Sequence, residues 1–272
     1  MGTRIAVAQI DSVLGDIEAN LERIGSFVSV AKEQGAQAVL FPELFTTGYS
    51  LGTDLRKLGE PVPGRTTDHL AHLAAENGIY IYGSIVERRG DKHYNAGVFL
   101  SPSEGVIAVY RKVHLFAEEK DLLNPGTEPV VVETDMGPIG LTICYDLVFP
   151  EYIRGLVLMG AQIIFNSTFW LRVGPPDEWD WSHRQPTALA VARALENTVG
   201  LAMSCRFGWE GDVLGFGHSC IVSPSGRILA SLGEGEGVTS AEIPMDRVAE
   251  FRKLATYFED RRVELYRKML GY

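Results

Sequence analysis

The first forty residues alternate between apolar runs and a segment with helical periodicity, and this order constrains the fold more than any other feature. Residues 4–9 form a short apolar run that is typical of a buried strand. Apolar residues then recur at helical spacing over 16–33, and 38–41 is apolar again. A strand, a helix and a second strand in this order predict the β-α-β unit of a layered α/β protein.

The remaining sequence continues this alternation. Helices are expected at 67–77, 151–159 and 183–196, strands at 79–86, 140–143, 163–165 and 200–204, hairpin turns at 102–105 and 224–227, and a turn between two strands at 233–237. This pattern predicts a mixed sheet with both faces covered. Because 46% of the 272 residues are hydrophobic and no linker or repeat interrupts them, we expect one domain over 1–272.

Charge and hydropathy exclude several classes of protein. A formal net charge of -10 argues against binding to a phosphate backbone, so no nucleic-acid partner is expected. No apolar run reaches the roughly 20 residues that cross a bilayer, so no membrane association is expected either. The opening residues lack the basic and apolar regions of a signal peptide, which predicts a cytoplasmic location.

The cysteines and histidines predict neither a metal nor a cofactor. Cys144, Cys205 and Cys220 are odd in number and show no CxxC spacing, which argues against disulfides and zinc. Cys205 and Cys220 have no adjacent acid or cation and are interpreted as packing residues. His69 and His72 share a helix face but lack a third ligand, so an exposed helix surface is expected there.

Three ionisable residues stand where a predicted strand passes into a loop, the usual place for functional groups in α/β sheets. Glu43 follows the apolar run 38–41 and Pro42, Lys112 ends the strand of the first hairpin, and Cys144 ends the strand at 140–143. Taken one at a time, Glu43 could form an ion pair at a strand end, Lys112 could extend into solvent, and Cys144 could fill the core. Their recurrence at three strand ends favours a shared site.

Three segments resemble, in order, the signatures of the nitrilase superfamily of carbon–nitrogen hydrolases. They are Phe41-Pro-Glu-Leu-Phe-Thr-Thr-Gly-Tyr49, Tyr110-Arg-Lys-Val-His-Leu-Phe116 and Ile143-Cys-Tyr-Asp-Leu-Val-Phe-Pro-Glu151. Segments 124–126, 193–197 and 217–226 are also similar to ones common in that superfamily, so the resemblance covers essentially the whole chain. It implies a four-layer αββα sandwich with mixed sheets, whose subunits pair into homodimers or larger homo-oligomers.

The resemblance also implies roles for these residues. Cys144 is the nucleophile, Glu43 the general base and Lys112 the cation that stabilises the oxyanion. A second glutamate of the family falls on Glu119, with Glu118 as the competing choice. Such a site hydrolyses a small-molecule amide with water, through a thioester to the cysteine, and releases ammonia.

Further residues are assigned to the substrate pocket and its support. We expect Tyr49, Tyr145, Asn166 and Trp170 to contact substrate, although an aromatic that only covers a sheet edge would also explain Trp170. The backbone N–H of Tyr145 is expected to join the lysine in binding the oxyanion. His114 is interpreted as a structural support for Lys112.

The residue four positions after Cys144 bears on the substrate. Many amidases of the superfamily carry arginine there, whereas this chain has Val148, which favours a neutral small aliphatic or aromatic amide over an anionic one. Arg172 and residues 177–181 could instead recognise a charged group, or form a surface loop. The alternatives are an N-carbamoyl amide hydrolase, a nitrilase, a non-catalytic interaction subunit and a thiol redox sensor.

Overall fold

The computed structural model describes residues 2–49, 54–172 and 182–271. Six strands form the first large sheet: β1 (Thr3–Gln9), β2 (Ala38–Leu40), β3 (Tyr80–Arg89), β4 (Lys92–Ser101), β5 (Gly105–Arg111) and β15 (Gly237–Ile243). Their order is β15-β1-β2-β3-β4-β5. The β1-β2 and β2-β3 pairs are parallel and the others antiparallel, so the sheet is mixed as predicted.

A second large sheet contains the strand that ends at the nucleophile candidate. Its strands are β6 (Val131–Val132), β7 (Ile139–Ile143), β8 (Ile163–Thr168), β10 (Gly200–Cys205), β13 (Cys220–Val222) and β14 (Ile228–Ser231). They lie in the order β14-β13-β10-β8-β7-β6, and the three central strands are parallel. The strand pattern predicted mixed pairing but not the two sheets that form, which the family resemblance implied, because periodicity locates strands but not their partners.

The longer helices begin and end at recognisable signals. The Asp16 side chain caps the first by accepting a hydrogen bond from the Ala19 N–H at 3.0 Å. Gly78 ends the helix at 65–77 with a φ of +58°, and Pro150 occupies the first turn of the helix at 150–158. The helices are α1 (Ile17–Glu33), α2 (Arg65–Asn77), α4 (Pro150–Leu158) and α5 (Arg184–Asn197), with shorter α3 (Glu119–Leu122), α6 (Val248–Leu254), α7 (Val263–Leu270), η1 (Leu55–Leu58), η2 (Cys144–Val148) and η3 (Met245–Arg247).

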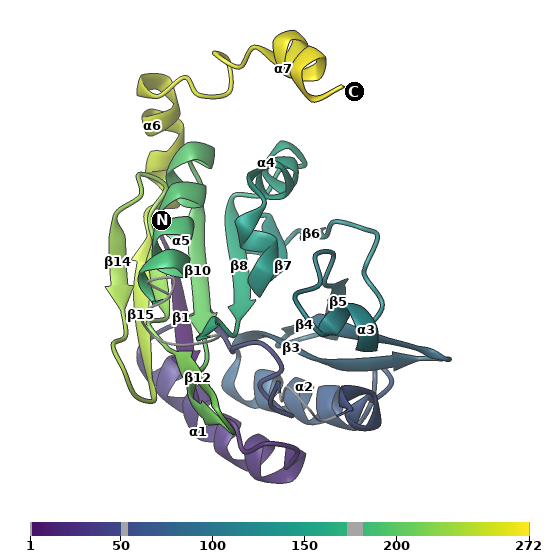
Figure 1. Ribbon diagram of the computed structural model, residues 1–272. Coiled ribbons are helices and arrows are strands. Elements are labelled where there is room, and N and C mark those ends of the chain that lie inside the picture. The colour runs from purple at the N-terminus through teal and green to yellow at the C-terminus, as the bar shows by residue number, and fades with distance from the viewer. Residues whose placement is uncertain (1, 50–53, 173–181, 272) are drawn as a thin grey trace.

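These elements stack in four layers within one chain (Figure 1). Helices α1 and α2 cover the outer face of the first sheet, and α4 and α5 cover the outer face of the second. The inner faces pack on each other through large side chains such as Phe99 and Phe165, whose rings lie 5.8 Å apart. The α/β class and the mixed sheets are thus confirmed, and the αββα layers lie within one chain; the layering expected on dimerisation stays a prediction.

Two parts of the structure lie outside these layers. Strands β9 (Leu171–Arg172), β11 (Phe207–Glu210) and β12 (Val213–Phe216) form a small third sheet that the sequence pattern did not predict. Helices α6 and α7 extend away from the layers at the top of Figure 1.

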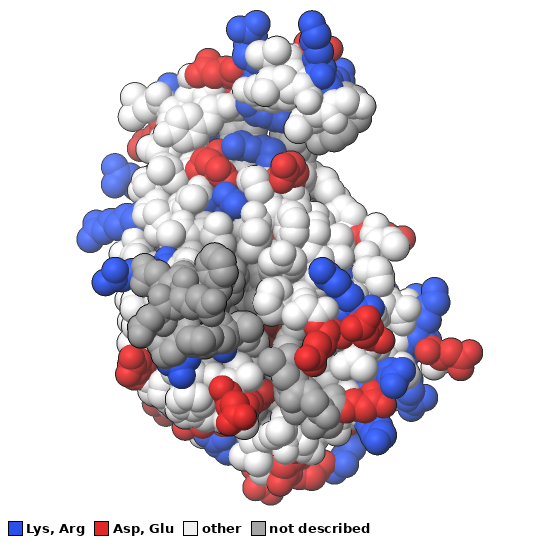
Figure 2. All heavy atoms as spheres, viewed as in Figure 1, with Lys and Arg blue, Asp and Glu red and all other residues white. Residues whose placement is uncertain are grey.

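None of the helices in the described part of the chain is both long and apolar enough to span a membrane. Figure 2 shows acidic and basic side chains interspersed over one face of the molecule.

Candidate active site

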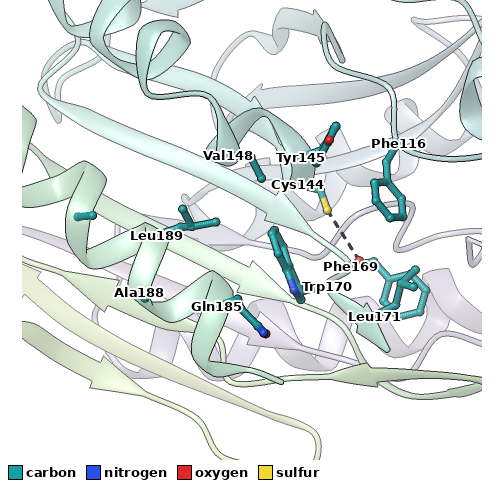
Figure 3. A pocket seen from close by; sticks show the side chains of 11 residues that line it. Phe116, Cys144, Tyr145, Val148, Phe169, Trp170, Leu171, Gln185, Ala188 and Leu189 are labelled. Carbon is teal, nitrogen blue, oxygen red and sulfur yellow. Dashed lines mark hydrogen bonds between the residues drawn. The ribbon is translucent and has the colours of Figure 1, made fainter. Parts of the chain in front are cut away.

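Cys144 stands at the turn between β7 and η2, just beyond the edge of the second sheet. Its φ is +42°, a left-handed conformation that is uncommon for a residue with a Cβ and often found at functional sites. The side chain is buried and its Sγ lies 3.7 Å from the carbonyl oxygen of Phe169, drawn as the dashed line in Figure 3. The sharp turn therefore points the thiol away from the strand and toward a cavity.

Lys112, Glu43 and Glu119 form a buried ionic cluster. The Nζ of Lys112 lies 2.7 Å from an oxygen of Glu43 and 2.7 Å from an oxygen of Glu119. All three side chains are essentially inaccessible to solvent. Two carboxylates around one ammonium group satisfy the requirement that a buried charge be paired.

The structure separates the two candidates for the second glutamate. Glu119 begins α3, and besides Lys112 it accepts a hydrogen bond from the Phe116 N–H at 2.8 Å. Glu118 is the exposed residue before that helix. Because successive residues at a helix start point in different directions, only Glu119 can face inward.

Asn95 completes the cluster and was not anticipated from the sequence. Its buried Nδ2 donates to Glu43 at 2.7 Å and to Glu119 at 2.8 Å. Asn95 lies in the middle of β4, opposite Val86 in the ladder, and has no neighbouring motif. A polar residue inside an otherwise buried strand is the only signal that could have found it.

The pKa values follow from burial and from these contacts. Burial and the carboxylate of Glu43 raise the pKa of the Cys144 thiol well above its usual value, although Lys112 acts in the opposite direction. Burial also raises the pKa of Glu43, opposed by Lys112 and by a hydrogen bond from the thiol. Burial alone would lower the pKa of Lys112, but Glu119 and Glu43 outweigh it and raise that pKa. The free site therefore holds a protonated thiol, and the lysine stays charged.

Asp146 connects the cysteine turn to the loop that carries the lysine. Its buried carboxylate accepts hydrogen bonds from the Ile143 N–H at 2.9 Å and from the Tyr110 hydroxyl at 2.6 Å. It also lies 2.8 Å from the Nδ1 of His114, whose ring stacks on Phe149. His114 is thus placed as a structural support, as expected, and Asp146 fixes the two segments relative to each other.

The thiol opens into a cavity of about 570 Å³. None of the described residues that line it carries a charge (Figure 3). They are Phe116, Cys144, Tyr145 and Val148, then Phe169, Trp170 and Leu171, and from α5 Gln185, Ala188, Leu189 and Ala192.

Of the four residues assigned to the substrate pocket, the structure places two in the cavity wall. Tyr145 and Trp170 line it. Tyr49 is not among the lining residues; it is buried with its ring 5.5 Å from that of Phe169, and burial and the nearby Glu119 raise its pKa. Asn166 lies within β8 and donates to the Thr142 hydroxyl at 3.0 Å. Its side chain is on the face of the strand that α4 and α5 cover, because side chains alternate along a strand.

Arg172, the remaining described candidate for substrate recognition, is not among the lining residues of the cavity. Its guanidinium lies 5.4 Å from the centre of the Trp209 ring. Residues 177–181 lie outside the described residues. His72 pairs with Glu76 on the exposed surface of α2, and within the described ranges no three potential ligands gather around a metal position.

The two other cysteines are packing residues in this structure. Cys205 and Cys220 are fully buried in the strands of the second sheet. Burial raises the pKa of each thiol to about 12. A thiol of that kind is inert at neutral pH.

Comparisons with known proteins find similar sequences and similar solved structures. A family model described as carbon–nitrogen hydrolase matches residues 4–253. A probable nitrilase of Schizosaccharomyces pombe is 33% identical over 100% of both chains, and a 2-oxoglutaramate amidase of Bacillus subtilis is 34% identical over 96% of this chain and 98% of its own. The solved amidase of Nesterenkonia sp. AN1 is 31% identical, has a TM-score of 0.85, and is matched over 98% of this chain and 99% of its own.

Proposed function

The chain belongs to the carbon–nitrogen hydrolase family, and on this premise we propose that it is an amidase that hydrolyses neutral amides through a thioester to Cys144. The observation that carries the proposal is the buried Lys112 between Glu43 and Glu119, beside a thiol that opens into an uncharged cavity. One structure of the Nesterenkonia amidase shows the acetamide moiety of fluoroacetamide added covalently at its active site cysteine, which supports a cysteine nucleophile here.

The first half of the proposed reaction forms the acyl-enzyme. Glu43 takes the proton of Cys144, and the sulfur attacks the amide carbon, so that a C–S bond forms and the carbonyl electrons move to oxygen. The Lys112 ammonium and the backbone N–H of Tyr145, at the start of η2, bind that oxyanion. When the intermediate collapses, Glu43 returns the proton to the nitrogen, the C–N bond breaks and ammonia leaves.

The second half hydrolyses the thioester. Glu43 takes a proton from water, the hydroxide adds to the acyl carbon, and the C–S bond breaks to release the carboxylic acid. The thiolate recovers the proton from Glu43, which restores the starting state. Glu119 contacts the Lys112 ammonium at 2.7 Å, as Glu43 does, and keeps it in position.

The cavity supports a neutral acyl group rather than a charged one. Val148 lines it, and so do apolar side chains from α5, and the described lining offers no cation to pair a substrate carboxylate. A carboxylate buried there without a partner would cost several kcal/mol. The two relatives named for nitrilase and 2-oxoglutaramate amidase activity share the same family, so a panel of substrates must decide among the chemistries.

The test is ammonia release over neutral amides, dicarboxylate monoamides, N-carbamoyl compounds and nitriles. We expect neutral amides to be the best substrates, and intact-protein mass spectrometry to show an acyl adduct on the wild type but not on Cys144→Ala. Removal of the nucleophile should lower kcat by roughly four to six orders of magnitude. Unchanged hydrolysis by Cys144→Ala would refute the mechanism, and turnover of nitriles without amides would refute the assignment as an amidase.

A further inference from the structure

The cavity beside Cys144 is much larger than a small amide requires. Its volume of about 570 Å³ falls within the range of roughly 300–1,000 Å³ that is typical of sites for drug-sized ligands. An amide such as propionamide would leave most of that space unfilled. The cavity is partly open to solvent, and its described walls leave room for a longer acyl group than that of propionamide.

One helix supplies the wall that determines how far the cavity extends. Gln185, Ala188, Leu189 and Ala192 all line it, and their spacing of three, four and seven residues places them on one face of α5. Ala188 and Ala192 are one turn apart and each presents only a methyl group. The wall is therefore recessed at two successive turns.

The side walls come from the segments that hold the nucleophile. Val148 of η2 and Trp170, which follows β8, lie on either side of the space between Cys144 and the labelled Leu189 of α5 in Figure 3. Leu189 and Val148 both also pack against the hydrophobic core, so these walls are anchored. An acyl group bound to the sulfur would thus run between two apolar surfaces toward the recess on α5.

We propose that this site is selective for amides of extended apolar acids, such as medium-chain alkanamides and arylalkanamides, and that Ala188 and Ala192 set the length it accepts. This inference rests on the proposed amidase function. Each methylene that enters the recess is removed from water, which corresponds to about fourfold in kcat/KM per methylene until the recess is full. Branching beyond the recess, or a charge at the end of the chain, lowers kcat/KM.

The experiment measures kcat/KM of the full chain for a homologous series from acetamide to octanamide, together with 3-phenylpropanamide. We expect kcat/KM to rise with chain length past propionamide before it levels. Ala192→Leu should lower the ratio of kcat/KM for hexanamide to that for propionamide by at least tenfold. Leu189→Ala, which deepens the recess, should move the optimum to a longer chain.

The matched control is Ala75→Leu, the same change at an exposed position of α2 that does not line the cavity. It should leave the hexanamide to propionamide ratio within twofold of wild type. Because both substrates are measured on one sample, partial unfolding of a variant cancels from the ratio.

The outcomes separate this inference from the proposed function. If acetamide and propionamide are hydrolysed but kcat/KM falls with every added methylene, the selectivity is wrong and the amidase function stands. A hexanamide to propionamide ratio that neither Ala192→Leu nor Leu189→Ala changes also overturns it. If no amide of any length releases ammonia, the proposed function fails first, and the selectivity fails with it.

Discussion

Two cations are fully buried within the described part of the chain, Lys112 and Arg206, and their surroundings differ in a way that separates chemistry from architecture. Lys112 contacts two carboxylates, those of Glu43 and Glu119, at 2.7 Å each. Arg206 forms an ion pair with one carboxylate, that of Glu210, and donates to the Ser12 carbonyl at 2.9 Å. Both cations are fully buried, so the difference lies in the number of carboxylates that contact them directly.

The surplus carboxylate gives the lysine cluster its capacity for proton transfer. One ammonium and two carboxylates leave a net charge of -1, so a proton received by Glu43 brings the cluster to neutrality. The Arg206 pair is already neutral, and its Nε and Nη1 have no hydrogen-bond partner among the described residues. Burial lowers the pKa of Arg206, whereas the two acids raise that of Lys112.

The lysine cluster and the Arg206–Glu210 pair both contact Phe169. Its N–H donates to Glu43 at 3.0 Å and its carbonyl faces the Cys144 sulfur, while its ring lies 5.2 Å from the Arg206 guanidinium. The Arg206 pair therefore packs behind the residue whose backbone orients the base and the thiol. We expect changes at Lys112 to affect the reaction first and changes at Arg206 to affect stability first.

The largest effect is expected from Lys112→Met. Loss of the cation removes an oxyanion donor, which lowers kcat/KM by about 100- to 1000-fold, and leaves two buried carboxylates without their counter-ion. Ammonia release, with circular dichroism to verify folding, measures it. A folded variant with wild-type kcat/KM would break the distinction between the two clusters.

The second comparison sets Glu119→Gln against Glu118→Gln. Glu119 holds the lysine, so its loss should reduce kcat/KM by about 100-fold, whereas the exposed Glu118 is a neighbour with no contact to the cluster. Both variants are measured on the same amide. Equal effects would show that Glu119 does not act through Lys112.

Disruption of the Arg206–Glu210 pair should reduce stability more than activity. Arg206→Met removes the cation that pairs with the buried Glu210, which costs about 3–5 kcal/mol in the free energy of unfolding, with less than a tenfold change in kcat/KM. Arg206→Met combined with Glu210→Gln should recover much of that loss, because the amide oxygen can still accept from the Tyr49 N–H. Urea unfolding of the single and double variants measures the coupling, and strictly additive losses would contradict a functional pair.

The smallest expected effect is a displaced acid limb in the pH dependence of kcat/KM. Glu43 must be ionised to accept the thiol proton, and burial raises its pKa above 4.5. As pH decreases, kcat/KM should therefore fall with an apparent pKa higher than that of an ordinary glutamate. Rates from pH 4 to 9 test this, with Glu118→Gln as a control that keeps the same limb. A limb at or below 4.5 would remove Glu43 from the role of base.

Much of the local structure followed from hydrophobic periodicity and from capping and turn residues. The predicted helix at 16–33 is α1 after its Asp16 cap, and the turn at 233–237 separates β14 from β15. The β9-β11-β12 sheet was missed because its strands have two to four residues, too few to establish an alternation. Periodicity could not show the division into two sheets, which only the family resemblance implied, because strand pairing depends on contacts between residues far apart in sequence.

The sequence by itself determined which residues could do chemistry: Glu43, Lys112 and Cys144 each end a strand, and their motifs identify the family. Only the tertiary structure placed them together with Asn95 and formed the cavity along α5. It also left Asn166 and Tyr49 outside the cavity lining. The physical reason is that periodicity and caps act over a few residues. A buried charge cluster and a cavity are instead made by packing segments that the chain separates by up to about a hundred residues.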